Sequence, residues 1–161
     1  MIVADTSSIR SLTSIDLLET LLTEFDVHVT ELVIEELEET SEYDDRHGDA
    51  ARTPLDNRDR ITVHEIPGEF RSSRVDDGEG SCALLTKEID AEFLLTDDLR
   101  ALPELETIAD AKVAISPIVL EALIRRDILT DEAATEKLDE LAETRDWLGA
   151  PIYRRARALF E

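Results

Sequence analysis

Short apolar runs alternate along this chain with longer segments in which apolar residues recur every three or four positions. The short runs predict buried strands at residues 2–4, 27–29, 61–66, 93–95 and 113–115. The longer segments predict helices at residues 7–25, 31–42, about 78–89, 98–105, 117–126 and from 130 onward. This alternation favours an α/β fold of three layers, α/β/α, with a central parallel sheet of about five strands.

The segments between these elements are polar or contain turn-forming residues. Residues 41–60 include Gly48 and Pro54, which favours a loop with a short helix. Residues 67–77 are interpreted as a second loop, and residues 153–160 as a basic tail. A chain of 161 residues suits a single domain with a complete core, in which residues from about 117 to 161 form a helical C-terminal segment.

The charge of the chain is strongly negative, with 39 acidic and 17 basic residues and a net charge of −22. Disorder and mimicry of nucleic acid both produce such a charge, but the apolar periodicity argues against disorder. The acids are spread along the chain, and lysine is limited to Lys87, Lys112 and Lys137. This bias resembles proteins of halophiles with a salty cytoplasm, where the screening length falls to about 3 Å at molar salt. The charge therefore does not exclude a nucleic-acid substrate.

The lack of recognisable targeting segments and the single cysteine favour a cytoplasmic protein. No apolar run approaches the roughly 20 residues of a membrane helix, and the N-terminus lacks the pattern of a secretory signal. Cys82 is the single cysteine, so an internal disulfide is excluded. We therefore expect no membrane association and a cytoplasmic location.

Two carboxylates follow predicted strands directly, at Asp5 and Asp97. In parallel sheets, functional sites lie outside the carboxyl ends of the strands. Asp5 also suits the N-cap of the following helix, although Ser7 or Ser8 would serve equally. In the TDD segment, Asp98 is the natural N-cap of the next helix and leaves Asp97 at the sheet end, but the two roles can be exchanged.

Two further carboxylates lie on predicted helices among apolar residues. Glu36 lies at the edge of the apolar face of its helix, and a buried carboxylate requires a partner such as a cation. The alternative is a slightly rotated helix that places Glu36 at the boundary with solvent. Glu79 opens a helix between Gly78 and Gly80, where a carboxylate is also favoured by the helix dipole.

A cluster of these four acids would require cations to remain ionised. Carboxylate oxygens suit Mg²⁺ or Mn²⁺, and such carboxylate sites are used by many nucleases to cut phosphodiesters. Other chemistries lack their signatures. His28, His47 and His64 share no zinc-ligand spacing with Cys82, and no glycine loop with a P-loop lysine is present.

The order of these motifs resembles the PIN-domain family of ribonucleases. The segments in which this resemblance is seen are IVADTSSI, VIEEL, DDGEGSCALL, FLLTDDLRAL and ISPIVLEALIRRDIL, which together span about residues 1 to 130. The resemblance implies that Asp5, Glu36, Glu79 and Asp97 form the catalytic and metal-binding site. A glutamate at position 79 departs from the aspartate more usual in other PIN branches, and residues 41–60 match no family motif.

The resemblance also implies the remaining features of the site and its partners. It implies a metal-dependent endoribonuclease, and many relatives are VapC-like toxins that form homodimers and are neutralised by an antitoxin. Ser7 or Thr6 is expected to orient Asp5 or a water, and Asp98 to hold a metal-bound water. Candidate phosphate contacts are Arg71, Arg74 and Arg100, whose alternative is salt bridging on an acidic surface.

Two other functional classes are compatible with an α/β fold and clustered acids. A PIN fold without catalysis would serve as a nucleic-acid or protein-binding scaffold, but all four acids are present. A response-regulator receiver domain is disfavoured because Lys112 precedes its predicted strand and Asp5 lies too near the N-terminus to carry the paired acids.

Overall fold

The computed structural model describes residues 1–66 and 74–160. Within these ranges, a five-stranded sheet has the order β3-β2-β1-β4-β5, and each neighbouring pair is parallel. The strands are β1 (Ile2–Ala4), β2 (Val27–Thr30), β3 (Thr62–His64), β4 (Phe93–Leu95) and β5 (Lys112–Ala114). The parallel sheet confirms the predicted fold class, although β3 is shorter than the predicted strand at 61–66.

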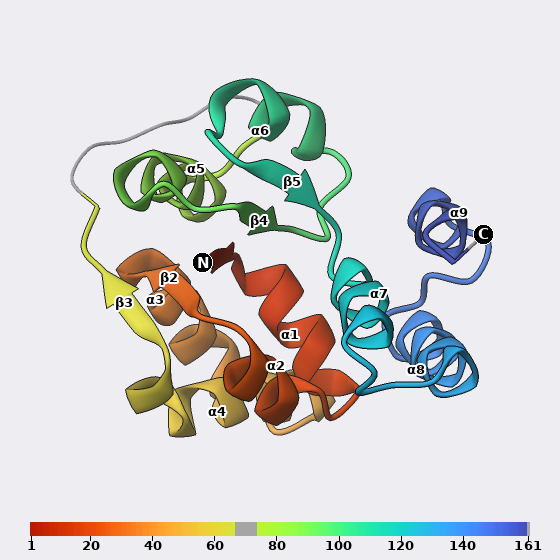
Figure 1. Cartoon of the computed structure of the whole chain (residues 1–161). Coiled ribbons are helices and arrows are strands. Elements are labelled where there is room, and N and C mark those ends of the chain that lie inside the picture. Colours follow the sequence, from red (N-terminus) through yellow and green to blue (C-terminus); the bar gives the residue numbers. More distant parts are fainter. Residues whose placement is uncertain (67–73, 161) are drawn as a thin grey trace.

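Helices cover both faces of this sheet and complete the three layers (Figure 1). On one side lie α1 (Thr6–Ser14), α2 (Leu18–Glu24), α3 (Glu31–Ser41) and α4 (Arg46–Asp56), followed by the short 3₁₀ helix η1 (Arg58–Arg60). On the other side lie α5 (Asp77–Ile89) and α6 (Leu102–Ile108). The chain ends in α7 (Ile118–Arg125), α8 (Asp131–Thr144) and α9 (Pro151–Ala158), which lie together beside β5 and α1.

Two predictions for the first sixty residues are wrong in their boundaries. The single helix predicted at 7–25 is two helices, because Asp16 adopts a left-handed conformation with φ of 58° between them. The polar segment 41–60 contains the complete helix α4, whose N-terminus is capped when the Asp45 carboxylate accepts the N–H groups of His47 and Gly48. The buried side of α4 is made of small residues, which produce little apolar signal in the sequence.

Three predictions for the later helices also need correction. The helix predicted at 98–105 begins at Leu102, and the Asp98 carboxylate accepts the Arg100 N–H in a preceding turn instead of capping the helix. The helix predicted at 117–126 begins at Ile118 with Pro117 as its N-cap residue, and the preceding Ser116 donates its hydroxyl to Asp97 instead of capping the helix. The predicted basic tail at 153–160 lies largely within α9.

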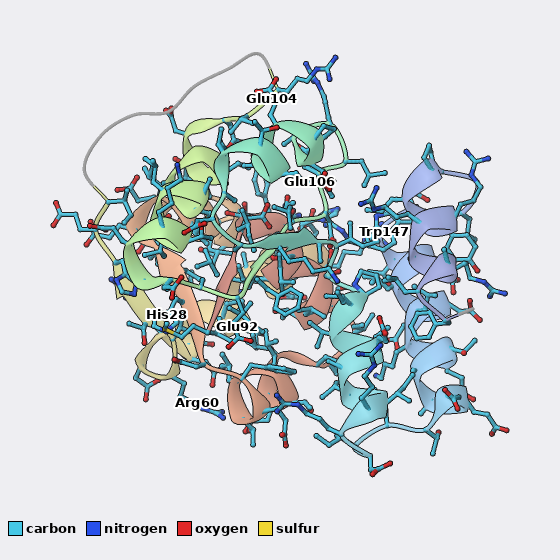
Figure 2. The ribbon with its side chains drawn as sticks, turned by 45° about the horizontal axis from the view of Figure 1, so that its top comes forward. His28, Arg60, Glu92, Glu104, Glu106 and Trp147 are labelled. Carbon is cyan, nitrogen blue, oxygen red and sulfur yellow. The ribbon has the colours of Figure 1, made fainter. Side chains whose placement is uncertain are left out.

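The core is built from the short strands and the apolar faces of the helices packed on them. Val3, Val29, Leu94, Leu12 and Leu85 have no solvent exposure. Trp147 is also buried, and Figure 2 shows it on the side of the C-terminal helices, away from His28 on β2. None of the helices in the described ranges has both the length and the apolar character needed to span a bilayer.

Candidate active site

The winding of the sheet changes direction between β1 and β4. The chain places β2 and β3 on one side of β1, and β4 and β5 on the other. In parallel sheets, such a divergence of the crossover connections opens a crevice outside the carboxyl ends of the strands. Asp5 follows β1 directly, and Asp97 and Asp98 follow β4 shortly after Leu95, so all three lie at this end of the sheet.

A pocket of about 170 Å³ occupies this position. It receives side chains from the ends of β1 and β4 and from helices α1, α3 and α5. Its lining residues are Asp5, Thr6, Ser7, Arg10, Glu36, Asp76, Gly78, Glu79 and Asp98. The tertiary structure therefore brings together acids that are separated by more than 90 positions in the chain.

Asp5 lines the pocket and is almost completely buried, with only 4% of its surface exposed. Its Oδ1 accepts hydrogen bonds from the Ser8 N–H at 2.9 Å and the Ser7 hydroxyl at 2.8 Å. Asp5 is therefore the N-cap of α1 as well as a pocket residue, and the two interpretations of its sequence position are compatible. Burial raises the pKa of its carboxyl to about 6, although hydrogen bonds from Thr96, Ser8 and Ser7 oppose the shift.

Glu36 reaches the pocket from α3 and is fixed by a neighbouring hydroxyl. Its Oε2 accepts a hydrogen bond from Thr6 Oγ1 at 2.9 Å. Its Oε1 lies so close to Gly78 that a Cβ at position 78 would overlap it. Burial, followed by the charges of Asp76 and Asp5, raises the pKa of Glu36 to about 7. The half-buried Glu36 thus faces other carboxylates, as expected for a residue that requires a cation partner.

Glu79 is the least satisfied acid of the pocket. Its Oε2 is buried and has no hydrogen-bond partner among the described residues. Burial is the largest cause that raises its pKa to about 9, and the charges of Asp76, Asp98 and Asp5 add to the shift. Asp76 lies beside it as the N-cap of α5, where its carboxylate accepts the Glu79 N–H at 2.8 Å.

We expect Glu79→Gln to stabilise the metal-free protein increasingly as the pH rises. Because the pKa of Glu79 is raised by folding, its contribution to stability is complete below about pH 4.5 and is lost as the pH rises through about 9. The glutamine variant has no such loss. Thermal unfolding in the presence of a chelator between pH 5 and 9 should show a growing difference between the variant and the wild type.

The exposed Glu38→Gln in α3 controls for the loss of one negative charge from an acidic protein. A difference between Glu79→Gln and the wild type that stays constant from pH 5 to 9 would contradict this account of Glu79.

Asp97 and Asp98 have different positions relative to the pocket. Both carboxylate oxygens of Asp97 are engaged by Ser116, at 2.6 Å from its N–H and 2.7 Å from its hydroxyl. Asp97 does not line the pocket, whereas Asp98 does. The Asp97 N–H donates to Ser7 Oγ at 3.0 Å, and this hydroxyl in turn donates to Asp5. The geometry therefore favours the exchanged roles, with Asp98 facing the pocket and Asp97 supporting it.

Two of the three arginines predicted to meet phosphates do not line this pocket. Arg74 and Arg100 are exposed and are not among its lining residues. Arg71 lies outside the described residues. Their contact with phosphates stays a prediction.

Sequence reasoning missed Asp76, Gly78 and Arg10 as pocket residues. Asp76 precedes Glu79 by three positions, which is the spacing of an N-cap and its third helical residue. That spacing could have moved the start of the helix forward and identified Asp76. Arg10 gives no comparable signal, because its place in the pocket depends on how α1 lies against the sheet.

The donor set fits a divalent cation, although it is not preassembled. Among residues 1–66 and 74–160, no three Asp, Glu, His or Cys side chains are gathered closely enough to hold an ion. The unpartnered Oε2 of Glu79 and the raised pKa values of Asp5, Glu36 and Glu79 nevertheless show carboxylates that lack a counter-charge. Hard oxygen ligands of this kind match Mg²⁺ or Mn²⁺.

Comparison with known proteins gives a single assignment. A search of curated proteins found no significant match. The family model DUF3368, described as a PIN domain, matches residues 1–161. PIN domains are typically nucleases, and they generally use divalent metal ions. Because the match covers the full sequence, and because the parallel sheet carries its acids at the switch point, this chain belongs to the PIN-domain family.

Proposed function

We propose that this protein is a metal-dependent endoribonuclease that hydrolyses phosphodiester bonds in RNA. The observation that carries the proposal is the convergence of Asp5, Glu36, Glu79 and Asp98 on one pocket at the switch point of the sheet. Burying several carboxylates together without a cation is unfavourable, so such an arrangement is best explained by a function that requires it. Membership of a family of nucleases supports the same conclusion.

In this proposal, Asp5, Glu36, Glu79 and Asp98 hold one or two Mg²⁺ or Mn²⁺ ions. These residues would hold the metal, which would supply an activated water and neutralise charge on the leaving oxygen. Ser7 fixes the rotamer of Asp5, and Thr6 fixes that of Glu36, through the hydrogen bonds described above. Asp97 links the end of β4 to Ser116 after β5, and thereby positions the turn that carries Asp98.

Gly78→Ala is expected to lower cleavage by between about tenfold and 100-fold without unfolding the protein. The added Cβ would overlap Glu36 Oε1, so the glutamate must move from its position beside Thr6. Displacements of this size reduce catalysis strongly, whereas alanine suits a helical position better than glycine does. Cleavage rates and melting temperatures of the two proteins check this, and an unstable variant or an unchanged rate would contradict it.

The proposed function is tested by cleavage of a mixed RNA pool in molar KCl with Mn²⁺ or Mg²⁺, with a chelator and with single-stranded DNA as controls. We expect RNA fragments that appear only with the metal. Gel analysis of end-labelled products would show whether the cuts are internal. A folded protein that binds RNA and cleaves neither polymer with either metal would favour the competing function of a catalytically silent scaffold.

We further propose that the enzyme acts in the cytoplasm of a salt-adapted cell as the toxin of a toxin–antitoxin pair. The acidic composition with few lysines supports the salty setting, and the likeness of its motifs to VapC-like proteins supports the toxin role. This role includes an antitoxin protein as partner and a homodimer as the assembled form. Growth arrest on expression, relieved by the product of the adjacent gene, would test it.

A further inference from the structure

A second pocket, of about 240 Å³, adjoins the carboxylate pocket and differs from it in charge. Its walls are formed by α1, α4 and the end of α8, and its basic lining residues are Arg10, Arg46, His47 and Arg145. Arg10 lines both pockets, so this side chain lies between them and borders each. We call the second one the arginine pocket.

Among the described residues, the arginines of this pocket make no ion pair with an acid, in contrast to five other arginines of the protein. Ion pairs to Asp or Glu are made by Arg52, Arg60, Arg125, Arg126 and Arg155. In the part of the chain that the structure describes, no carboxylate oxygen lies within 4.0 Å of Arg10, Arg46 or Arg145. With 39 acids in the chain, three arginines without such a pair in one pocket require an explanation.

Two acids also line the arginine pocket and do not neutralise it. Asp49 is paired with Arg52, and Asp16 lies on the exposed turn after α1. Neither makes an ion pair with the three arginines among the described residues. Asp45 and Asp97 act on Arg10 and Arg145 through their charges. Among the described residues they form no ion pair with these arginines, so the guanidinium groups keep N–H donors for an external anion.

The guanidinium groups of this pocket are also incompletely hydrogen-bonded. The Nε atoms of Arg10 and Arg145 are buried and have no acceptor in the described structure. Arg10 Nη2 lies 2.9 Å from His47 Nδ1, so its nearest side-chain partner is an imidazole and not a carboxylate. Burial, followed by the nearby charge of Arg145, lowers the pKa of Arg10. A buried donor without a hydrogen-bond acceptor lowers the stability of the folded protein. Guanidinium groups bind phosphate through paired N–H donors.

We infer that the arginine pocket binds a backbone phosphate of the nucleic-acid strand, adjacent to the phosphodiester held at the carboxylate pocket. This inference rests on the proposed function, since it assigns a place to a second phosphate of the same substrate. The position of this pocket beside the carboxylate pocket, with Arg10 bordering both, favours a nucleic-acid strand over an acidic protein segment, because a strand carries phosphates at regular intervals. Contacts to phosphate position the strand without reading its sequence.

Binding is measured first, in a background in which cleavage does not interfere. Asp5→Asn protein is titrated against a fluorescent single-stranded RNA oligonucleotide by anisotropy, at several KCl concentrations. Arg46→Gln and Arg145→Gln are each expected to weaken binding by about tenfold and to reduce the salt slope by about 1. Arg58→Gln, which removes the same charge beyond the other end of α4, should change affinity less than about twofold.

Cleavage by the otherwise wild-type enzyme then separates the subsite from the catalytic centre. We expect Arg46→Gln and Arg145→Gln to lower kcat/KM about tenfold on the oligonucleotide. A dinucleotide with a single phosphodiester cannot reach the arginine pocket, so its cleavage should be unchanged. Melting temperatures confirm that each variant is folded, and the exposed Arg46 keeps the test valid if Arg145→Gln is unstable.

The outcomes distinguish this inference from the proposed function. Unchanged RNA binding in both variants, or equal losses on the dinucleotide and the oligonucleotide, would overturn the phosphate subsite. Variants that lose affinity for an Asp- and Glu-rich peptide but not for RNA would assign the pocket to an acidic protein and overturn it as well. Arginine-dependent RNA binding by a wild-type protein that never cleaves RNA would support the subsite and remove the proposed activity.

Discussion

Replacing Asp5 with asparagine is expected to abolish metal-dependent RNA cleavage, with a loss of roughly 10³-fold or more, the scale seen when one essential catalytic group is removed. Asparagine has the same shape, and its oxygen can still accept the hydrogen bonds from Ser7 and Ser8. It lacks the negative charge with which Asp5 would bind a metal ion. The rate should therefore collapse while the helix cap and the fold remain.

Stability provides the control for this variant. Burial raises the pKa of Asp5 to about 6, so the contribution of this group to stability is complete below its ordinary pKa and is lost as the pH rises through 6. The neutral asparagine has no such loss, and the metal-free variant should be at least as stable as the wild type at pH 8. Added Mn²⁺ should raise the melting temperature of the wild type more than that of the variant. A folded Asp5→Asn protein with wild-type cleavage would overturn the site.

Asp98→Asn is expected to lower RNA cleavage by about 100-fold or more, whereas Asp97→Asn should keep activity within about tenfold. Asp98 lines the pocket with the other acids, and its charge is expected to contribute to metal binding. Asp97 accepts from both the N–H and the hydroxyl of Ser116. An asparagine at 97 can accept from the N–H and donate to the hydroxyl, which preserves this link.

The pair of variants is matched, since both remove one carboxylate from neighbouring positions of the same turn. Cleavage rates are measured over a series of Mn²⁺ concentrations. Asp98→Asn should need a higher Mn²⁺ concentration than the wild type to reach half of its maximal rate, whereas Asp97→Asn should need a near-normal concentration. The reverse ranking would show that Asp97 turns toward the metal on binding. Ser116→Ala tests the link separately, because it removes the hydroxyl that engages Asp97 and should lower activity less than Asp98→Asn does.

The acids of the site show how far local sequence patterns reach. Asp5 was identifiable because an apolar strand ends at it, and a parallel sheet concentrates functional groups at such ends. Glu36 and Glu79 lie close to apolar residues on helices, where a buried carboxylate needs a partner, but this left alternatives open, and the resemblance to the PIN-domain family was needed to select them. The structure places all three in one pocket. The choice between Asp97 and Asp98 depends on Ser116, which is 19 positions away, and no local pattern contains that information.

The secondary-structure elements also differ in how far the local sequence predicts them. Strands β1, β2 and β4 were predictable since they are short, mostly apolar and fully or largely buried. Helix α4 was not recognised as a full helix, because it buries Gly48, Ala50, Ala51 and Pro54 and thus has a weak apolar pattern. The break after α1 was hidden as well, since the left-handed conformation of Asp16 interrupts a periodicity that continues on both sides.

By itself, the sequence determined the alternation of strands and helices, the excess of negative charge and the candidate acids, because these follow from residue type and local spacing. Only the tertiary structure decided which acid after β4 faces the pocket, that Asp76 and Gly78 complete it, and that Arg10, Arg46 and Arg145 meet in a neighbouring pocket. These arrangements depend on the packing of α1, α4 and α8, which brings together side chains up to 135 positions apart. Packing of this kind arises from contacts between distant segments, and it leaves no regular period in the chain.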